Sequence, residues 1–368
     1  MASMLFSIAA LFFSDAAAQY APTWASLDTR PLPAWYDDAK IGIFIHWGVF
    51  SVPSFGTSSG GASGEWFWWM WEGEKDPAYV DFVAQTEAPQ WTYADYAPRF
   101  QAEFWNATQW AELFAASGAR YVVPTSKHHE GFTNWPSATS FQWNSVDVGP
   151  HRDLIGELGA AVKAAGLTFG VYHSLFEWFN PLFLEDQAAG FHANISTSQF
   201  LQKTFGELRD LIERYQPQLI WSDGDWMAPD LYWDAPQNFL QWLVNDSPVK
   251  DTVVFNDRWG QGDTCKHGSY WTCADRYLPS STQGRKWENV RLPTESPAKA
   301  RSARTHTRAF PYRPFAGFHH RQGLMGVSAQ RGLHRLLNCF GGCAYRDWHR
   351  GPGRQRTHQR GTLARWHH

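Results

Sequence analysis

The sequence is poor in cysteine, and it has no long apolar run beyond its first residues. Four cysteines in 368 residues allow at most two disulfides. The candidate pair is Cys265 and Cys273, which lie close together in a loop rich in glycine and polar residues. An oxidising compartment would allow that bond to form. No later segment is long and apolar enough to span a bilayer, which excludes a protein held in the membrane by internal helices.

Residues 1–18 have the pattern of a secretory signal peptide. The apolar run from Met4 to Phe13 is too short to span a membrane, and the alanines at 16–18 offer a cleavage site. Three glycosylation acceptor triplets follow, which begin at Asn106, Asn194 and Asn245. Pro248 makes the third a poorer acceptor. We therefore expect the chain to enter the secretory pathway.

Acidic residues almost disappear from the last part of the chain. Residues 291–368 hold 15 Lys+Arg and 2 Asp+Glu, a formal charge of +13, whereas residues 1–290 sum to −16. Such a segment cannot bury enough apolar surface to offset the entropy of ordering, so we expect little order after about residue 300. The charge reversal favours a shifted reading frame or a mispredicted exon over a genuine basic tail that binds anionic partners. The acidic body argues against nucleic acid as a partner.

Apolar strand-like runs alternate with amphipathic helix patterns in the first 256 residues. The pattern predicts strands at 41–46, 121–125, 168–173, 219–222 and 253–256, and helices at 107–117, 153–165, 197–215 and 238–244. Repeated strand–helix units imply parallel strands joined by right-handed crossovers. The number of units favours an α/β fold of the (β/α)8 or TIM-barrel type over an open sheet.

A glycine-rich phosphate turn is missing after the first predicted strand. An open dinucleotide-binding sheet would need that turn, and the chain has His46-Trp47-Gly48 instead. In a barrel the active site lies where the strands end and the next loops begin. Polar residues do gather at those positions, namely His46, His128, His129, Tyr172, His173, Asp223 and residues 256–258.

The segment Trp221-Ser222-Asp223-Gly224-Asp225-Trp226 is the strongest indication of chemistry. It places carboxylates where an apolar strand breaks into a glycine turn, between indoles whose faces suit a sugar. A retaining glycosidase needs a carboxylate nucleophile and a second carboxyl group that acts as acid and then base. We predict Asp223 as the nucleophile, although an aspartate here could merely cap a turn. Asp225 is predicted to be supporting or solvated.

The second carboxyl group has two candidates. Glu288 and Asp275 each lie in a long segment that could approach Asp223 from a loop. A general acid must hold its proton near the working pH, which burial or a nearby carboxylate would favour. The spacing does not choose between the two residues.

Three histidines at strand ends are predicted to donate hydrogen bonds to sugar hydroxyls. They are His46, His128 and His129. A metal site is disfavoured because the first strand offers one histidine, and because adjacent residues of an extended chain point to opposite sides. We therefore expect neither a metal nor a cofactor.

A segment dense in tryptophan follows the first predicted strand. We expect a loop at 65–71 in which Glu65 binds sugar hydroxyls and Trp66 belongs to a stacking wall, while other rings pack on the barrel rim. Farther along the chain, Arg258 would bind substrate or hold a carboxylate. A structural salt bridge explains Arg258 equally well.

Eight segments together carry a family resemblance, among them Trp221-Ser222-Asp223-Gly224 and Lys127-His128-His129-Glu130-Gly131-Phe132. They resemble the α-L-fucosidases of glycoside hydrolase family 29, in particular the lysosomal animal type. The segments are residues 30–37, 42–51, 65–69, 127–132, 149–154, 172–174, 221–224 and 256–260. The resemblance runs from about residue 24 to about residue 289.

The resemblance implies a retaining exo-glycosidase that releases terminal α-linked L-fucose from glycoproteins and glycolipids by double displacement, without a metal or cofactor. It implies Asp223 as the nucleophile and either Glu288 or Asp275 as the acid/base. It also implies fucosylated glycans as partners, no membrane, a lysosomal or extracellular location and, for a full-length chain, a homo-oligomer. The positions that match the family's fucose-binding set are His46, Glu65, Trp66, His128, His129, Tyr172, Trp221 and Arg258.

The resemblance ends after about Asn289. The family's closing barrel segment, with its Trp-Gly-Tyr and Gly-Asn-Tyr-Leu-Leu-Asn-Ile-Gly patterns, is absent from the sequence, and so is its C-terminal β-sandwich. We therefore expect a signal peptide at 1–18, a catalytic barrel at 19–290 that is incomplete at its closing strands, and a basic, low-order tail at 291–368. Unpaired sheet edges are an aggregation hazard, so the alternative is a truncated fucose-binding protein with impaired catalysis.

Overall fold

A mainly parallel sheet of seven strands forms the centre of the part of the chain that the computed structural model describes. That part comprises residues 19–57, 64–229, 232, 235–275, 277–291 and 318–320. The predicted signal peptide and most of the predicted tail lie outside the described residues. The strands are β1 (Ile41–Ile45), β2 (Tyr121–Lys127), β3 (Thr168–Ser174), β4 (Leu219–Asp223), β5 (Val254–Phe255), β6 (Asn289–Arg291) and β7 (Phe318–His320).

The strand order β5-β4-β3-β2-β1-β7-β6 leaves the sheet open among the described residues. The strands β1 to β5 pair in parallel, whereas β7 pairs antiparallel with both β1 and β6. The prediction of a mainly parallel sheet is therefore confirmed, whereas its incompleteness at the closing strands stays a prediction. The strand β7 lies in the segment predicted to have little order, and that prediction stays untested for the rest of the segment.

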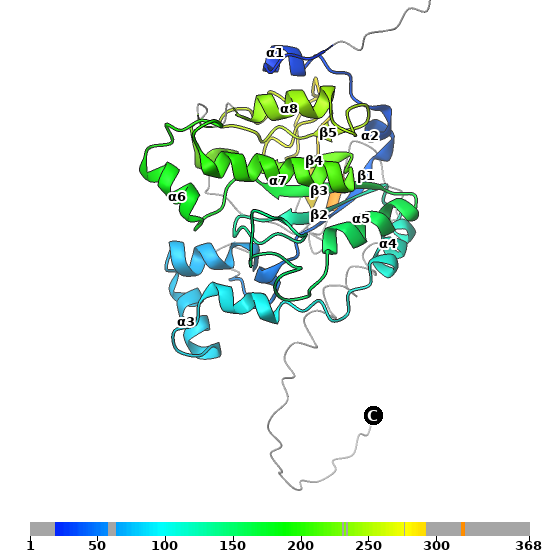
Figure 1. Cartoon of the computed structure of the whole chain (residues 1–368). Coiled ribbons are helices and arrows are strands. Elements are labelled where there is room, and N and C mark those ends of the chain that lie inside the picture. Colours follow the sequence, from blue (N-terminus) through cyan, green and yellow to red (C-terminus); the bar gives the residue numbers. More distant parts are fainter. Residues whose placement is uncertain are drawn as a thin grey trace, which may run out of the picture. The chain divides into compact units, whose positions relative to one another are not determined.

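Helices connect successive strands and pack on one another alongside the sheet. They are α1 (Trp24–Leu27), α2 (Ala34–Ala39), α3 (Pro77–Thr86), α4 (Ala107–Ala116), α5 (Leu154–Ala164), α6 (Pro181–Ala188), α7 (Gln199–Tyr215) and α8 (Ala235–Asn245). Helix α5 packs against both α4 and α7, and α7 packs against α8 (Figure 1). None of the described helices is long and apolar enough to cross a bilayer.

Helix α7 shows why the sequence folds this way locally. The Oγ of Ser198 accepts a hydrogen bond from the N–H of Leu201 at 2.9 Å, which caps the first turn. The chain leaves the helix at Gln216 in the left-handed conformation (φ 46°), one residue before Pro217. Phe205 and Leu208 are among its buried apolar positions, and they face the core beneath the sheet.

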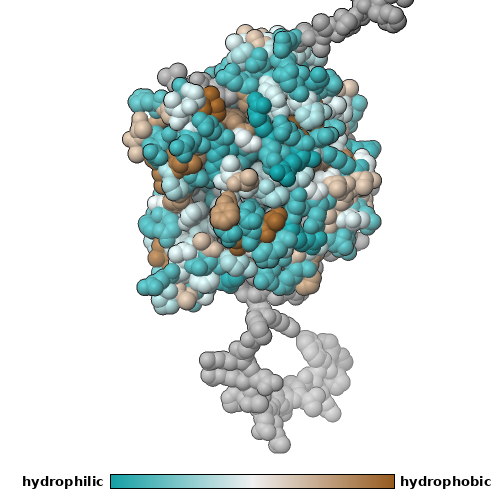
Figure 2. Space-filling view, viewed as in Figure 1, coloured by the Kyte–Doolittle hydropathy of each residue, from teal (hydrophilic) through white to brown (hydrophobic). Residues whose placement is uncertain are grey.

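The central strands are buried on both faces. Every residue of β2 and β4 is buried, as is usual for parallel strands covered by helices. The face of the molecule seen in Figure 2 is mostly hydrophilic, and its apolar residues are scattered. Most apolar side chains of the described residues are therefore buried within the sheet and helices.

The predicted strands and helices all occur within a few residues of their expected ends, but several helices were missed. Helices α3 and α6 each begin with a proline behind a capping Asp76 or Asn180, which is a recognisable start signal. The prediction of a loop at 65–71 was wrong. The segment forms the 3-10 helix η2 (Gly64–Trp66) and the π-helix η3 (Trp69–Gly73), because its large rings pack on neighbouring aromatic side chains.

Candidate active site

Asp223, the last residue of β4, is held by one donor on each carboxylate oxygen. The Oη of Tyr172 donates a hydrogen bond to Oδ2 at 2.8 Å, and Nη1 of Arg258 donates to Oδ1 at 3.0 Å. The register of β3 against β4 places Tyr172 beside Trp221 and Ser174 beside Asp223. The carboxylate is therefore oriented at the carboxyl ends of the parallel strands, where we predicted the site.

Arg258 joins two predicted carboxylates through one guanidinium group. Besides Asp223, it donates from Nη2 to Oδ1 of Asp275 at 2.7 Å and from Nε to Oγ1 of Thr272 at 3.0 Å. Its guanidinium also lies over the ring of Trp221, 4.7 Å from the centroid. Arg258 thus forms the expected salt bridge, and it does so with both candidate catalytic groups. The side chain of Asp275 is 20 % exposed.

Glu288 occupies a different place. It is 2 % exposed, and its carboxylate accepts hydrogen bonds from Oη of Tyr121 at 2.7 Å and from Nε1 of Trp221 at 3.1 Å. Tyr121 is the first residue of β2, whereas Asp223 is the last residue of β4. Glu288 is therefore anchored toward the amino ends of the parallel strands, while Asp275 shares a guanidinium with Asp223.

Four of the predicted sugar-binding residues form one cluster of rings. The ring of His46 lies 5.2 Å from that of His128 and 4.7 Å from that of Tyr172. The rings of His128 and His129 are 4.2 Å apart. The expectation that these two adjacent histidines point to opposite sides was wrong. The strand β2 ends at Lys127, and a turn follows in which the N–H of Gly131 donates to the carbonyl of His128 at 3.0 Å.

His129 presents an acceptor rather than a donor to the site. The Oγ of Ser174 donates its hydrogen to the carbonyl of Phe176 at 2.6 Å, so it accepts one from Nδ1 of His129, also at 2.6 Å. Burial, with His128 and His46 nearby, holds the pKa of His129 well below its usual value. The neutral ring therefore carries its proton on Nδ1, and Nε2, 3.6 Å from Oδ2 of Asp223, is left to accept a hydroxyl hydrogen.

Asp225 is buried, which contradicts the solvated alternative for this residue. It follows Gly224, whose φ of 99° turns the chain into the 3-10 helix η5 (Asp225–Met227). The Oγ1 of Thr264 donates to its Oδ2 at 3.0 Å. Burial raises the pKa of Asp225 to about 7, with Arg258 opposing the rise and Asp223 adding to it. Asp225 is thus a neutral carboxyl group beside Asp223 in mildly acidic solution.

The tryptophan-rich segment divides between the site and the packing around it. Trp66 contacts the ring of His129 edge-on at 5.8 Å, and Glu65 before it is buried on η2. Trp68 instead stacks on Tyr93, with centroids 4.5 Å apart and an angle of 2°. Trp71 is buried in the apolar core. The predicted packing of some of these rings on their neighbours is therefore confirmed, whereas the stacking of Trp66 on a sugar stays a prediction.

Sequence reasoning gave no role to Asp257, which organises the loop that reaches Arg258. Its carboxylate accepts hydrogen bonds from the N–H groups of Cys265, Thr272 and Cys273 at 2.7, 2.9 and 3.1 Å. A disulfide joins Cys265 to Cys273, with Cα atoms 4.5 Å apart. The only available signal was the position of Asp257 directly before Arg258.

The other predicted sites differ in their surroundings. Asn106 and Asn194 are exposed. The side-chain amide of Asn245 instead bonds both the N–H and the carbonyl of Tyr20, which leaves it poorly placed to accept a glycan. Across the residues with assigned positions, no group of three or more His, Cys, Asp or Glu side chains is arranged to hold a metal ion.

Residues 8–296 match the family model described as alpha-L-fucosidase. The chain belongs to the α-L-fucosidase family. It is 57% identical over 270 residues to the tissue alpha-L-fucosidase of Rattus norvegicus, which covers 73% of this chain and 56% of the relative. It is 58% identical over 275 residues to the alpha-L-fucosidase of Branchiostoma floridae (74% and 58%), and 55% over 278 residues to the human plasma alpha-L-fucosidase (75% and 57%).

Solved structures of the family share the fold. A Thermotoga maritima alpha-fucosidase in complex with a mechanism-based inhibitor superposes with a TM-score of 0.60 at 33% identity, over 73% of this chain and 60% of that one. The predicted α/β fold of the TIM-barrel type is confirmed. The chain spans just over half the length of the curated relatives it matches.

Proposed function

We propose that this chain carries the catalytic site of a retaining α-L-fucosidase that hydrolyses terminal α-L-fucosyl linkages of glycoproteins and glycolipids. The observation that carries the proposal is the pair Asp223 and Asp275 on one guanidinium group of Arg258. A retaining glycosidase needs its two carboxyl groups about 5–5.5 Å apart. Two carboxylates that share one guanidinium are close enough to act on one glycosidic bond.

In the first step Asp223 attacks the anomeric carbon of the fucosyl unit. Asp275, in its protonated form, gives its proton to the departing glycosidic oxygen, and a covalent ester forms on Asp223. In the second step the Asp275 carboxylate removes a proton from water. The resulting hydroxyl group attacks the anomeric carbon, Asp223 leaves, and fucose is released with its anomeric configuration retained.

We assign the acid/base role to Asp275 rather than Glu288 because of its access to solvent and its shared partner. The incoming water and the departing glycan must both reach this group, and the Asp275 side chain is partly exposed. Glu288 is enclosed by Tyr121 and Trp221. Its proposed role is to fix the indole of Trp221, whose ring lies beneath the guanidinium of Arg258.

The surrounding side chains bind the sugar and hold the nucleophile. Tyr172 and Arg258 orient the two oxygens of Asp223. His129 accepts a hydrogen bond from a sugar hydroxyl through Nε2, and His46 and His128 line the same cluster of rings. The remaining members of the proposed fucose-binding set are Glu65, Trp66 and Trp221.

Hydrolysis of an aryl α-L-fucoside tests the proposal. Wild-type protein should turn over the substrate, and Asp223→Ala should lose nearly all activity. Azide should restore turnover to Asp275→Ala with formation of fucosyl azide, and it should not do so for Glu288→Ala. Rescue of the Glu288 variant alone would reverse the acid/base assignment. Binding of fucose by the wild type without any turnover would instead support the catalytically impaired binding protein.

We further propose that the protein passes through the secretory pathway to the lysosome or the extracellular space. The disulfide between Cys265 and Cys273 fits an oxidising compartment, and named relatives include tissue and plasma enzymes. The expectations of a homo-oligomer, of no membrane contact and of no nucleic-acid partner remain predictions.

A further inference from the structure

A groove of about 620 Å³ lies between the 3-10 helix η4 (Tyr93–Arg99) and the turns that follow β2 and β3. We call it the aromatic groove, because Trp68, Trp91, Trp143 and Phe179 line it. Its volume falls within the range of about 300–1,000 Å³ that is usual for small-molecule sites. Asp223, Arg258 and Asp275 are not among its lining residues.

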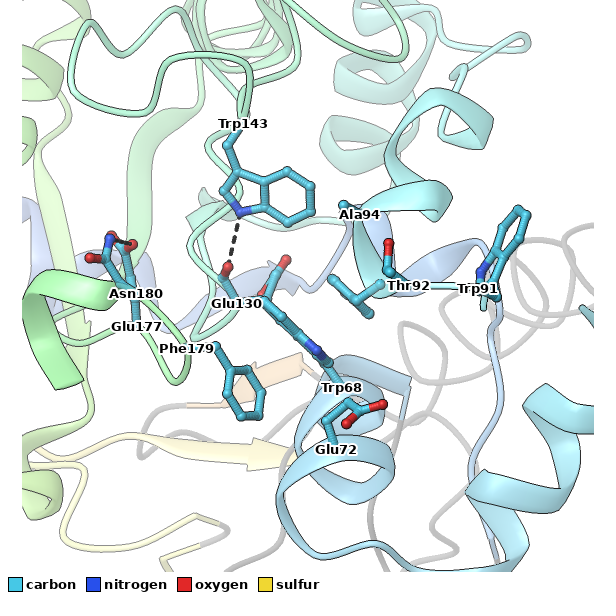
Figure 3. Close-up of a pocket in the computed structure, with 11 residues that line it drawn as sticks. Trp68, Glu72, Trp91, Thr92, Ala94, Glu130, Trp143, Glu177, Phe179 and Asn180 are labelled. Carbon is cyan, nitrogen blue, oxygen red and sulfur yellow. Dashed lines mark hydrogen bonds between the residues drawn. The ribbon is translucent and has the colours of Figure 1, made fainter. Parts of the chain in front are cut away.

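The aromatic rings of the groove are half-buried and fixed in place. Trp68 stacks on Tyr93 on one side and meets Phe179, with centroids 4.4 Å apart. The Nε1 of Trp143 donates to the carbonyl of Glu130 at 3.0 Å, the dashed line in Figure 3. Rings that already hold one conformation lose little entropy when a ligand covers them. They form a preorganised apolar surface.

A buried carboxylate completes the lining. Glu130 is 4 % exposed, and Figure 3 shows it among Trp143, Trp68 and Phe179. Its buried Oε2 accepts no hydrogen bond from the residues that have assigned positions, and it lies 3.4 Å from Nδ1 of His128. Buried polar groups are nearly always hydrogen-bonded in proteins. The Glu130 carboxylate is therefore available to accept hydroxyl hydrogens from a ligand.

Among the three carboxylates that line the groove, Glu130 alone has no lysine or arginine partner within the described residues. The other two carboxylates already have basic partners, since Glu72 pairs with Lys75, and Glu177 pairs with Lys127 and Lys203. A ligand of the groove must therefore combine an apolar face for the rings with hydrogen-bond donors for Glu130. A pyranose has both features.

We propose that the aromatic groove is an accessory binding site for a neutral pyranose unit of an oligosaccharide. It goes beyond the proposed hydrolysis and does not require it. The exposed hydroxyl group of Thr92 at the rim donates to Oδ2 of Asp95 at 2.7 Å, so its oxygen remains able to accept a hydrogen bond from a second sugar hydroxyl.

Titration of the full chain with lactose and with N,N′-diacetylchitobiose, followed by saturation-transfer NMR, tests this proposal. Saturating L-fucose is added so that the catalytic site is filled. We expect saturable millimolar binding of at least one disaccharide. Trp91→Ala should weaken that binding about tenfold, because it removes one of the aromatic faces on which the sugar would stack. Ala94→Arg, at an exposed rim position, should block it if the tryptophan variant does not fold.

Trp242→Ala is the matched control. Both Trp91 and Trp242 are half-buried, and each carries an arginine guanidinium over its ring, Arg99 at 5.4 Å and Arg209 at 4.2 Å. This variant should bind the disaccharides as the wild type does.

Three results would overturn the accessory site. The first is that neither disaccharide binds. The second is that Trp91→Ala and Ala94→Arg bind the disaccharides as tightly as the wild type does. The third is that tetramethylammonium binds and the sugars do not. Hydrolysis of an aryl fucoside by the same protein preparations, assayed without added L-fucose, keeps the two proposals separate. Hydrolysis without disaccharide binding rejects the accessory site alone, whereas binding without hydrolysis rejects the proposed function alone.

Discussion

Asp223, Arg258 and Asp275 form one charged unit at the scale of single residues, and its middle member must be an arginine. A lysine has a single nitrogen and cannot occupy the three separate positions from which Nη1, Nη2 and Nε of Arg258 each meet a partner. We therefore expect Arg258→Lys to lower kcat/KM for an aryl fucoside by about 10²–10³-fold, as the loss of one preorganised donor does elsewhere. Arg214→Lys, at an exposed pair with Asp210, is the control and should leave kcat/KM unchanged.

Asp225 predicts a pH dependence of stability. Its pKa is about 7 in the fold against an ordinary value of 3.8, so the folded state binds the proton more tightly than the unfolded state does. The free energy of unfolding should therefore fall as the pH rises from about 4 to about 7, by up to about 4 kcal/mol. Asp225→Asn keeps a neutral group there and should escape this loss. Urea unfolding at pH 5 and pH 8 measures this loss of stability. An equal loss in the wild type and in Asp225→Asn would contradict the raised pKa of Asp225.

Only some of the site residues and their roles could be predicted from the sequence. The place of Asp223 at the carboxyl end of a strand was predictable because it directly follows an apolar strand pattern, whereas its role as the nucleophile remains a proposal. The choice between Asp275 and Glu288 could not be predicted, because it depends on the side of the sheet to which a long loop returns. The acceptor role of His129 depends on Ser174, a residue 45 positions away in the sequence, and no local pattern reveals that partner.

At the scale of elements, the loop closed by Cys265 and Cys273 carries Thr272 and brings Asp275 to Arg258. Closing so short a loop stabilises the fold by roughly 2–3 kcal/mol in the chain-entropy account. We expect Cys265→Ala/Cys273→Ala to lower the melting temperature. It should also lower kcat more than it changes KM, because the loop positions the acid/base. A variant with lower stability but unchanged kcat would refute the positioning role.

Helix α7 also supplies part of a buried network of four charges. Glu207 accepts from Lys127 at 2.8 Å and from Lys203 at 2.9 Å, and Glu177 pairs with the same two lysines. Glu207→Gln leaves the two lysines with one carboxylate, which should cost about 3–5 kcal/mol of unfolding free energy. Glu213→Gln, exposed on the same helix, should change little. Equal effects in urea unfolding would show that the network does not stabilise the fold.

The same network gives a second pH dependence, of opposite sign to that of Asp225. Burial alone would raise the pKa of Glu207, but Lys127 and Lys203 outweigh it and hold the pKa well below 4.5. The stabilisation from Glu207 should be present above the pKa that it has in the unfolded chain. It should be lost as the pH falls through the lower pKa that it has in the folded protein.

The periodicity of α7 predicted its apolar positions. It could not predict that Lys203 and Glu207 are also buried, since charged residues usually mark the exposed face of a helix.

At the scale of the whole molecule, every residue assigned to the site lies between His46 and Glu288. The described sheet is open, and the chain matches its relatives over just over half their length. The sequence could predict the order of the first five strands because each strand–helix unit is local. It could not predict that β7 and β6 pair antiparallel beside β1, because that pairing joins segments far apart in the chain.

The position of every assigned site residue before residue 325 predicts the effect of a truncation. Removal of residues 325–368 should leave kcat/KM for an aryl fucoside unchanged within about twofold, because no assigned site residue is lost. A complete loss of activity on truncation would show that the basic segment contributes to the active fold.

Covalent trapping tests the central claim most directly. The full chain is incubated with a 2-deoxy-2-fluoro-L-fucosyl fluoride, which forms the glycosyl ester and hydrolyses slowly, and the labelled peptide is identified by mass spectrometry. We predict one fluorofucosyl adduct on Asp223 and none in Asp223→Ala. An adduct on Asp225, Asp275, Glu288 or any other side chain would contradict the mechanism.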